Sequence, residues 1–169
     1  MAVNELEFVP VNLPEMSLEL EEFVNDLQEK DKKEVELCSK PDETPYECVY
    51  NVLLSCIDRF FVVYNEEIIG LVAHRPVMKD GYDMAVMCVL TSNKVKKYHK
   101  QYVLAAKRFV SSLAANYDAI VCEILDSYTS SLNMAKKLGF QKAAVYERNG
   151  GKFIVEVLRI SHGLDSERK

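Results

Sequence analysis

The stretch YDMAVMCVLTSNKVKKYHKQYV, residues 82–103, decides the fold because it joins an apolar run to a basic segment with helical spacing. Residues 82–90 are almost continuously apolar, as expected for a strand buried on both faces. A second apolar run, YDAIVCEIL, follows at residues 117–125. Between the two runs, apolar residues recur at helical intervals and predict a long amphipathic helix; they are Tyr102, Ala106, Phe109, Val110 and Leu113. The order strand, helix, strand predicts a parallel pair of strands.

The residues before this stretch predict strands and two helices. LEFVPVN gives a short strand at Leu6–Val11, and RFFVVYN and IIGLVAHRPV give two strands separated by the tight turn NEE. KDG, residues 79–81, is a second hairpin signal. Ser17 is the expected N-cap of the first helix. Thr44 and Glu47 form the pattern of a capping box at the start of the second helix. Between the helices QEKDKKEVE, residues 28–36, is expected to be an exposed charged connector.

The residues after the stretch predict a short helix and a closing hairpin. SYTSSLNMAKKLGF has a Ser/Thr-rich start and Gly139 as its C-terminal stop. KAAVYE and KFIVEVLRI flank the turn signal RNGG. The predicted order is β-α-α-β-β-β-α-β-α-β-β, which is an α/β fold with a mixed, mostly antiparallel central sheet and helices on both faces. We expect one domain over residues 1–163 and a frayed tail at residues 164–169.

The composition fits a globular domain of ordinary polarity. The chain has 169 residues, of which 49% are hydrophobic and 28% charged, and a formal net charge of −5. The acidic balance argues against a general nucleic-acid binder, which usually carries a basic face. The apolar runs are shorter than a bilayer span. MAVNELEFVP has no basic start and no apolar core segment, so no secretory signal is expected. We therefore expect a cytoplasmic protein without membrane contact.

The cysteines and histidines do not have the spacing of metal ligands. The five cysteines are odd in number, contain no CxxC pair and lie mostly in apolar segments. They are therefore expected to be reduced, buried thiols. The three histidines are scattered along the chain without a carboxylate or thiol partner at ligand spacing, so no metal site is expected.

Four lysines crowd the predicted start of the long helix: Lys94, Lys96, Lys97 and Lys100. Positive charge is unfavourable there because the positive end of the helix dipole lies at the N-terminus, at a cost of about 0.3–1 kcal/mol for each exposed charge. A bound anion would explain the arrangement. A solvated lysine-rich face, which needs no ligand, is the alternative.

The element order, with KKLGF before the closing hairpin, resembles the GNAT superfamily of acyl-CoA-dependent N-acyltransferases. The resemblance covers nearly the whole chain, and its best local match is Leu138-Gly139-Phe140, which looks like the end of the family's last helix. The stretches KYHKQYV and AANYDAIVCEILDSYTSSLNMAKKLGFQKAAVYERNGGKFIV also resemble GNAT-like proteins of tailed phages, including the internal virion protein family of short-tailed phages. The superfamily likeness implies a GNAT-like sheet whose two parallel strands splay apart.

The same resemblance implies acetyl-CoA as the cofactor, with its pantetheine arm in the gap between the splayed strands. By position, the backbone of Met87, Cys88, Val89 and Leu90 would bind the pantetheine. The pyrophosphate would lie on the loop and helix N-terminus that follow, where free N–H groups and the dipole favour an anion. Ser131 sits where the family has a small residue packed against the cofactor, although ordinary helix capping would also explain it.

The phosphate loop departs from the family pattern. The family has glycines here, which let the backbone approach the phosphates, and residues 95–102 contain none. Lys96, Lys97 and Lys100 would then hold the phosphates by charge. If the site is degenerate, the same lysines are only a solvated face.

The family's usual catalytic tyrosine is also missing, because the position four residues before Gly139 is Ala135. Tyr128 is a candidate substitute as the general acid, or else an exposed aromatic residue at the helix start. Glu123 is a candidate general base because it interrupts an apolar run, where a carboxylate must be paired, protonated or facing a cleft. Asp126 is expected to cap the next helix. The remaining candidate bases are Asp83 and His74.

Two functions follow. The first is an acetyl-CoA-dependent N-acetyltransferase that transfers an acetyl group to an amine acceptor by direct attack, with the acceptor pocket built from residues 28–45 and the RNGG hairpin. The second is a catalytically degenerate GNAT-fold phage protein that acts in virion assembly or as a binding module in the host cytoplasm. The first implies an acyl-CoA and an amine as partners. The second implies another copy of the chain or a virion protein.

Overall fold

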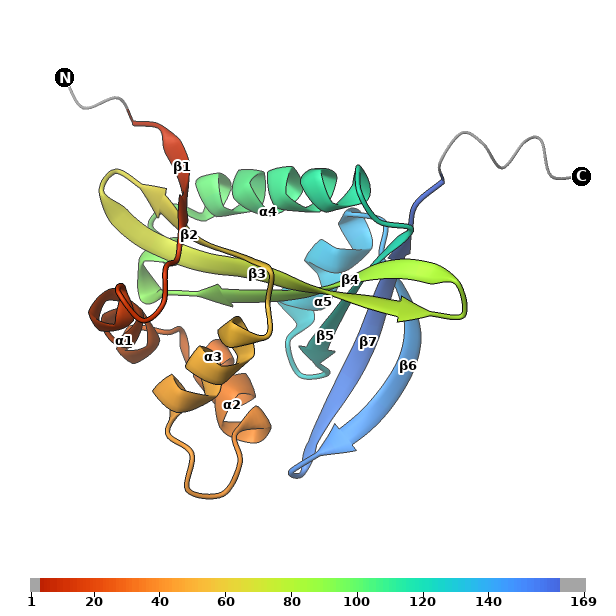
Figure 1. The fold of residues 1–169 in the computed structure, drawn as a ribbon, viewed down its shortest axis with the longest axis horizontal. Helices are drawn as coiled ribbons and strands as arrows, with labels where there is room; N and C mark the ends of the chain where they lie inside the picture. Colours follow the sequence, from red (N-terminus) through yellow and green to blue (C-terminus); the bar gives the residue numbers. More distant parts are fainter. Residues whose placement is uncertain (1–3, 162–169) are drawn as a thin grey trace, which may run out of the picture.

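The computed structural model describes residues 4–161 and contains one seven-stranded sheet (Figure 1). The strand order is β1-β2-β3-β4-β5-β7-β6. All neighbouring strands are antiparallel except β4 and β5, which are parallel. The prediction of a mixed, mostly antiparallel sheet with a parallel pair is confirmed. The strands are β1 Leu6–Pro10, β2 Asp58–Tyr64, β3 Glu67–Lys79, β4 Tyr82–Thr91, β5 Ala119–Leu125, β6 Gln141–Arg148 and β7 Gly151–Arg159.

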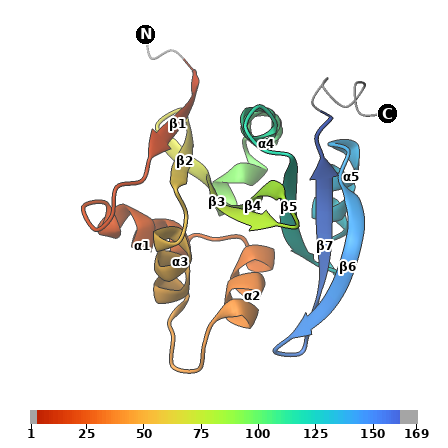
Figure 2. The same ribbon diagram turned by 45° about the vertical axis from the view of Figure 1, so that its right-hand side comes forward.

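Helices cover both faces of the sheet (Figures 1 and 2). They are α1 Ser17–Asn25, α2 Glu29–Cys38 and α3 Pro45–Leu54 on one face, and α4 His99–Ala114 and α5 Thr129–Lys137 on the other, with a 3-10 turn, η1 Asn93–Lys96, before α4. Phe61 and Leu71 pack with α1–α3, whereas their sequence neighbours Val62 and Val72 pack with α4. The alternation of side chains along β2 and β3 therefore builds an apolar core on each face.

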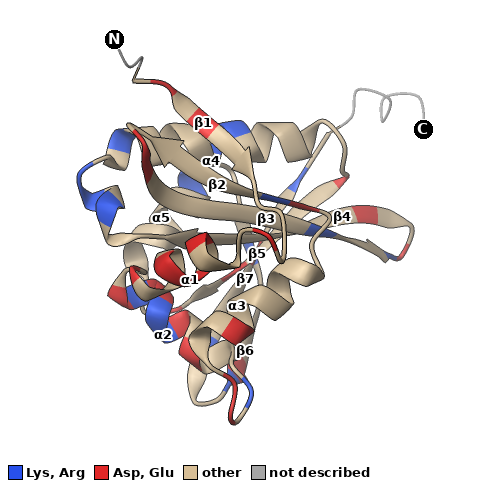
Figure 3. Cartoon of the chain, turned by 60° about the vertical axis from the view of Figure 1, so that its left-hand side comes forward, with Lys and Arg blue, Asp and Glu red and all other residues tan. Residues whose placement is uncertain are grey.

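The charged segment predicted as an exposed connector is instead helix α2, so the predicted order lacked one helix. Asp31 and Val35, which are four residues apart, are its buried side chains. The prediction was wrong because the two buried positions of α2 include only one apolar residue. A single apolar residue gives no hydrophobic periodicity from which a helix could be recognised. Figure 3 shows both acidic and basic residues along α2.

Of the two predicted N-terminal helix caps, one is present in the structure. At α3 the backbone N of Thr44 donates to Glu47 Oε2 at 2.8 Å, and the backbone N of Glu47 donates to Thr44 Oγ1 at 3.1 Å, which confirms the capping box. At α1 the prediction was wrong, because Met16 is the N-cap and Ser17 is the first helical residue. The Ser17 hydroxyl instead donates to the carbonyl of Pro14.

Three two-residue turns join antiparallel strands at the predicted places. They are Asn65–Glu66, Asp80–Gly81 and Asn149–Gly150, and φ is positive at both residues of each turn, between 51° and 82°. This conformation matches the right-handed twist of the flanking strands. The β6–β7 hairpin extends beside α2 (Figure 2), where the side chains of Arg148 and Asn149 donate to the carbonyls of Cys38 and Leu37.

β4 and β5 pair only over Met84–Val86 and Ala119–Val121. Beyond these pairs the described strands continue without hydrogen-bonding each other, β4 to Thr91 and β5 to Leu125. We call this opening, between residues 87–91 and 122–125, the β4–β5 wedge. The prediction that residues 82–90 are buried on both faces was therefore wrong in part, because Val86 to Val89 are only half-buried.

Candidate functional site

A cavity of about 1040 Å³ occupies the β4–β5 wedge. Its lining includes both wedge strands, α2 and α3 from one helical layer, and α4 and α5 from the other. The cavity therefore reaches both faces of the sheet. This shape allows two ligands that enter from opposite faces to meet between the strands.

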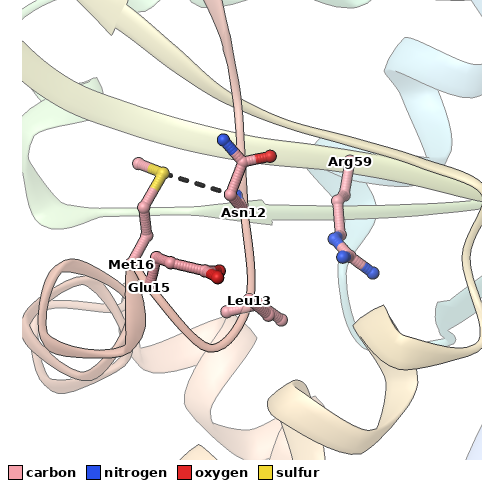
Figure 4. A pocket seen from close by; sticks show the side chains of 5 residues that line it. All are labelled: Asn12, Leu13, Glu15, Met16 and Arg59. Atoms are coloured by element: carbon pink, nitrogen blue, oxygen red, sulfur yellow. Dashed lines mark hydrogen bonds between the residues drawn. The ribbon is translucent and has the colours of Figure 1, made fainter.

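A smaller hollow of about 380 Å³ lies near the N-terminus and is lined by Asn12, Leu13, Glu15, Met16 and Arg59 (Figure 4). The Arg59 side chain donates to the carbonyls of Val11 at 2.8 Å and Leu53 at 2.9 Å. These bonds tie β2 to the segment that follows β1 and to the end of α3. The arginine therefore has a structural role, and the larger cavity is the stronger candidate site.

The free edge of β4 supplies unpaired backbone groups to the wedge. The backbone N of Thr91 donates to Asp31 and its carbonyl accepts from Gln28 at 3.0 Å, so both groups point away from β3. Because backbone groups alternate between the two edges of a strand, those of Met87 and Val89 also face the wedge, whereas those of Cys88 and Leu90 face β3. All four of these predicted residues line the cavity.

Asp31 of α2 binds the end of β4. One carboxylate oxygen, Oδ2, accepts from the backbone N of Thr91 at 2.9 Å and from the Thr91 hydroxyl. The side chain is buried, and burial raises the pKa of its carboxyl above the usual value, although the Thr91 hydrogen bonds oppose the shift. Asp31 thus fixes α2 to one wall of the wedge.

Glu34 lies one helical turn further along α2 and binds the end of β5. Its Oε1 accepts from the backbone N of Leu125 at 3.0 Å. Burial raises the pKa of this carboxyl to about 7, and the nearby charges of Asp31 and Glu123 add to the shift. Glu34 lines the cavity. A carboxyl that titrates near neutral pH inside a cavity can exchange protons with a ligand there.

Glu123, the predicted general base, lines the cavity from β5. Its Oε2 accepts from the hydroxyl of Tyr146 at 2.6 Å. Tyr146 stacks on Phe153, with ring centroids 5.5 Å apart. Burial, and then the hydrogen bond to Glu123, raise the pKa of Tyr146 above its usual value, so the tyrosine stays a donor. The side chain of Arg148 donates to the carbonyl of Cys38 at 3.2 Å and also lines the cavity.

The lysines at the start of α4 have different positions. Lys96 lines the cavity, and Lys97 and Lys100 do not. The ammonium of Lys97 lies 5.0 Å from the centroid of the Tyr98 ring, and Lys94 pairs with Asp26 at 3.6 Å. The N-cap of α4 is Tyr98, whose side chain makes no capping hydrogen bond to the first amides of the helix. The first amides of α4 are therefore available to an anion.

Two residues of α5 contact α2 across the open end of the wedge. Ser131 lines the cavity, and its Oγ accepts from Lys30 Nζ at 3.1 Å. Tyr128, the predicted general acid, is the N-cap of α5 and lies outside the cavity lining. Its hydroxyl donates to the carbonyl of Lys30. Burial raises the pKa of Tyr128 to about 12.

The other candidate bases do not line the cavity. His74 is buried on β3, with Nε2 2.9 Å from the hydroxyl of Tyr117, and burial lowers its pKa. The backbone N of Asp83 donates to Asp118 at 2.9 Å, which fixes the paired end of the wedge strands. Asp126 was predicted as a helix cap, and this was wrong, because Tyr128 occupies the N-cap position of α5.

Glu34 is the functional candidate that sequence reasoning missed. Its segment was interpreted as an exposed connector, so no carboxylate there was considered. The sequence signal that could have identified this helix is the spacing of Asp31 and Val35, because residues three or four apart lie on one face of a helix. Glu34 lies between them and three residues after Asp31, so the same helix would bring it toward the sheet. Within residues 4–161, no group of three or more His, Cys, Asp or Glu side chains is arranged to hold a metal ion. None of the described helices is long and apolar enough to cross a membrane.

No protein-family model and no curated protein matches this chain. Solved structures do match it. The ribosomal-protein-S18-alanine N-acetyltransferase from Escherichia coli matches with a TM-score of 0.66 and 11% identity, over 94% of this chain and 96% of that chain. AAC(6')-Ib in complex with ribostamycin and coenzyme A matches with a TM-score of 0.67 and 14% identity, over 98% of both chains.

The NatC complex bound to Gag peptide and CoA matches with a TM-score of 0.65 and 15% identity, over 93% of this chain and 99% of that chain. At these identities the likeness concerns the fold. The chain has the fold of the GNAT acetyltransferases, as its element order predicted, and its site must be argued from its own residues.

Proposed function

We propose that the protein is an N-acetyltransferase that binds acetyl-CoA in the β4–β5 wedge and transfers the acetyl group to an amine. The observation that carries the proposal is the wedge itself, with an unpaired β4 edge facing a cavity of about 1040 Å³ that reaches both faces of the sheet. Structures of the same fold contain CoA, one with ribostamycin and one with a peptide. Both pairings match a cavity that is open to two ligands.

The residues of the wedge fit the parts of acetyl-CoA. Met87 and Val89 would bind the pantetheine amides through backbone groups that face the wedge, in the manner of an added strand. The first amides of α4 and the ammonium of Lys96 would bind the phosphates. Ser131 would pack against the cofactor from α5. Because the loop lacks glycine, side-chain charge would supply a larger share of phosphate binding.

The chemistry requires a neutral amine beside the thioester. Acetyl-CoA supplies the acetyl group, which passes to the amine as the nitrogen attacks the thioester carbonyl. This chain's part is to orient the two ligands and to accept the amine proton, and a carboxylate in the cavity can do so. Tyr128 would reach a departing thiolate only after its hydrogen bond to the Lys30 carbonyl breaks.

The proposal predicts release of free CoA when the protein, acetyl-CoA and an amine are mixed. Release of the CoA thiol would be measured with each of several amines, including a polyamine, an aminoglycoside and a peptide with a free N-terminus. At least one amine should accept the acetyl group, with the product confirmed by mass spectrometry. Binding of acetyl-CoA without transfer to any member would favour the alternative predicted from the sequence, a catalytically degenerate phage protein, which stays a prediction.

A further inference from the structure

Two carboxylates flank the wedge on the face covered by α2 and the β6–β7 hairpin. Glu34 reaches it from α2 and Glu123 from β5, and both line the cavity. They are close enough for the charge of Glu123 to raise the pKa of Glu34. The first amides of α4 and Lys96, proposed above to bind the phosphates, belong to the opposite helical layer. The carboxylates therefore belong to the side from which an acceptor would enter.

We infer that Glu34 is the general base and that the acceptor is a primary amine carrying a positive charge at neutral pH, held between Glu34 and Glu123. The inference rests on the proposed function and specifies its substrate class.

Each carboxylate has one oxygen in use and one left for a ligand. Glu34 Oε1 accepts from Leu125, and Glu123 Oε2 accepts from Tyr146. No described residue is hydrogen-bonded to Glu34 Oε2 or to Glu123 Oε1. An ammonium group complements these two free carboxylate oxygens, because it has three donors and the opposite charge.

Two positive side chains near the carboxylates are already hydrogen-bonded, whereas Arg75 lines the cavity at the paired end of the wedge, opposite Val86. Lys30 donates to Ser131 at 3.1 Å, and Arg148 donates to the carbonyl of Cys38 at 3.2 Å. Asp31 is likewise bound to Thr91. At the open end of the wedge, the charges left to meet a ligand are therefore those of Glu34 and Glu123, and both are negative. This balance favours a cationic acceptor over a neutral or anionic one.

Burial raises the pKa of Glu34 to about 7, which lies close to neutral pH. Burial raises the pKa of the neighbouring thiols and phenols, which therefore stay neutral and do not compete for the proton. The titratable and charged neighbours are Lys30, Asp31 and Cys38 on α2, Cys88 on β4, Tyr102 on α4, Cys122 and Glu123 on β5, and Tyr128 on α5.

The proton balance of the step follows. The bound ammonium gives one proton to the Glu34 carboxylate, and the neutral nitrogen attacks the carbonyl carbon of the thioester. A C–N bond forms and the C–S bond breaks. The nitrogen loses its second proton, which neutralises the departing thiolate, and Glu34 releases its proton to solvent. The products are the amide, CoA thiol and one proton.

The test compares Glu34→Gln with Glu36→Gln, a matched change on the exposed face of the same helix. Spermidine serves as the cationic acceptor and aniline as the neutral one, with thiol release measured between about pH 5.5 and pH 9. For the wild type, kcat/KM with spermidine should rise through an inflection near pH 7. Glu34→Gln should lower kcat by roughly 100-fold, within the usual range for loss of a general base, and should remove the inflection. Glu36→Gln should match the wild type.

Three further measurements distinguish failure of this inference from failure of the proposed function or from misfolding of a variant. Glu123→Gln should raise KM for spermidine but leave KM for aniline unchanged, and Glu34→Asp should recover part of the lost kcat. Circular dichroism melts should show that each variant is folded. Retention of kcat and of the pH inflection by folded Glu34→Gln would overturn the inference while the acetyltransferase proposal stands. Absence of acetyl-CoA binding by the wild type would overturn both.

Discussion

Glu34 looks like a solvated carboxylate in the sequence, where it lies in the charged run QEKDKKEVE. In the structure, the packing of α2 brings it to the backbone N of Leu125 and leaves it only partly exposed. Burial in a medium of lower polarity disfavours the charged form, and the carboxylates of Asp31 and Glu123 disfavour it further. A residue whose neighbours come from α2 and β5 cannot be identified from local sequence alone.

This residue also makes stability depend on pH. The pKa of Glu34 is raised from 4.5 in the unfolded chain to about 7 in the fold. Its contribution is therefore fully present below the unfolded pKa and is lost as pH rises through the folded pKa. The free energy of unfolding of the wild type, relative to that of Glu34→Gln, should fall by about 2–3 kcal/mol between about pH 5 and pH 8.

Urea titrations at both pH values would measure this difference. Glu36→Gln is the control, because it alters the same helix at an exposed position. If the wild type and Glu34→Gln lose stability equally as pH rises, then Glu34 is not a buried carboxyl with a raised pKa.

At the scale of elements, helix α2 connects the two strands of the wedge. Asp31 holds the end of β4 and Glu34 holds the end of β5, so two side chains one turn apart bind both walls. The capping box of α3 and the three turns follow from residues adjacent in the sequence and were predicted. The helix α2 was not predicted, because polar contacts with distant strands determine its buried face.

The start of α4 gives a second prediction at this scale. Lys96 lines the cavity, whereas Lys94, two residues away, pairs with Asp26. Lys96→Ala should weaken the affinity for CoA about tenfold, equivalent to about 1.4 kcal/mol. Lys94→Ala should leave the affinity unchanged. Calorimetric titration would compare them, and the effect of Lys96 should shrink at high salt because exposed charges are screened. Equal effects of the two changes would indicate a general electrostatic contribution instead.

For the whole molecule, periodicity and element order were sufficient for the fold class. The apolar runs of β4 and β5 and the helical stripe of α4 predict a parallel pair within an antiparallel sheet, and the structure has this topology. The apolar run of β4 also led to the wrong prediction that this strand is buried on both faces along its whole length. A strand that lines a cavity and a strand in a closed core have similar sequences, since both are apolar. Met87 to Val89 are half-buried because the wedge separates them from β5.

The backbone part of the candidate site was predicted in full, whereas only some of the predicted side chains, Lys96, Glu123 and Ser131, line the cavity. The wedge residues Met87 to Leu90 were expected from position along β4, and all line the cavity. The side-chain candidates depended on tertiary contacts. The Tyr128 hydroxyl is bound to the carbonyl of Lys30. Of the three predicted phosphate-binding lysines, Lys96 lines the cavity and the other two do not. Element order does not specify these side-chain directions.

The central claim is that acetyl-CoA binds along the free edge of β4. The most direct test is a titration of the 15N-labelled protein with acetyl-CoA, followed by amide NMR. The account predicts saturable shifts concentrated at Met87, Val89 and the first amides of α4, with smaller shifts at Cys88 and Leu90, whose amides face β3. Absence of shifts at millimolar acetyl-CoA, or shifts confined to residues outside the wedge, would contradict it.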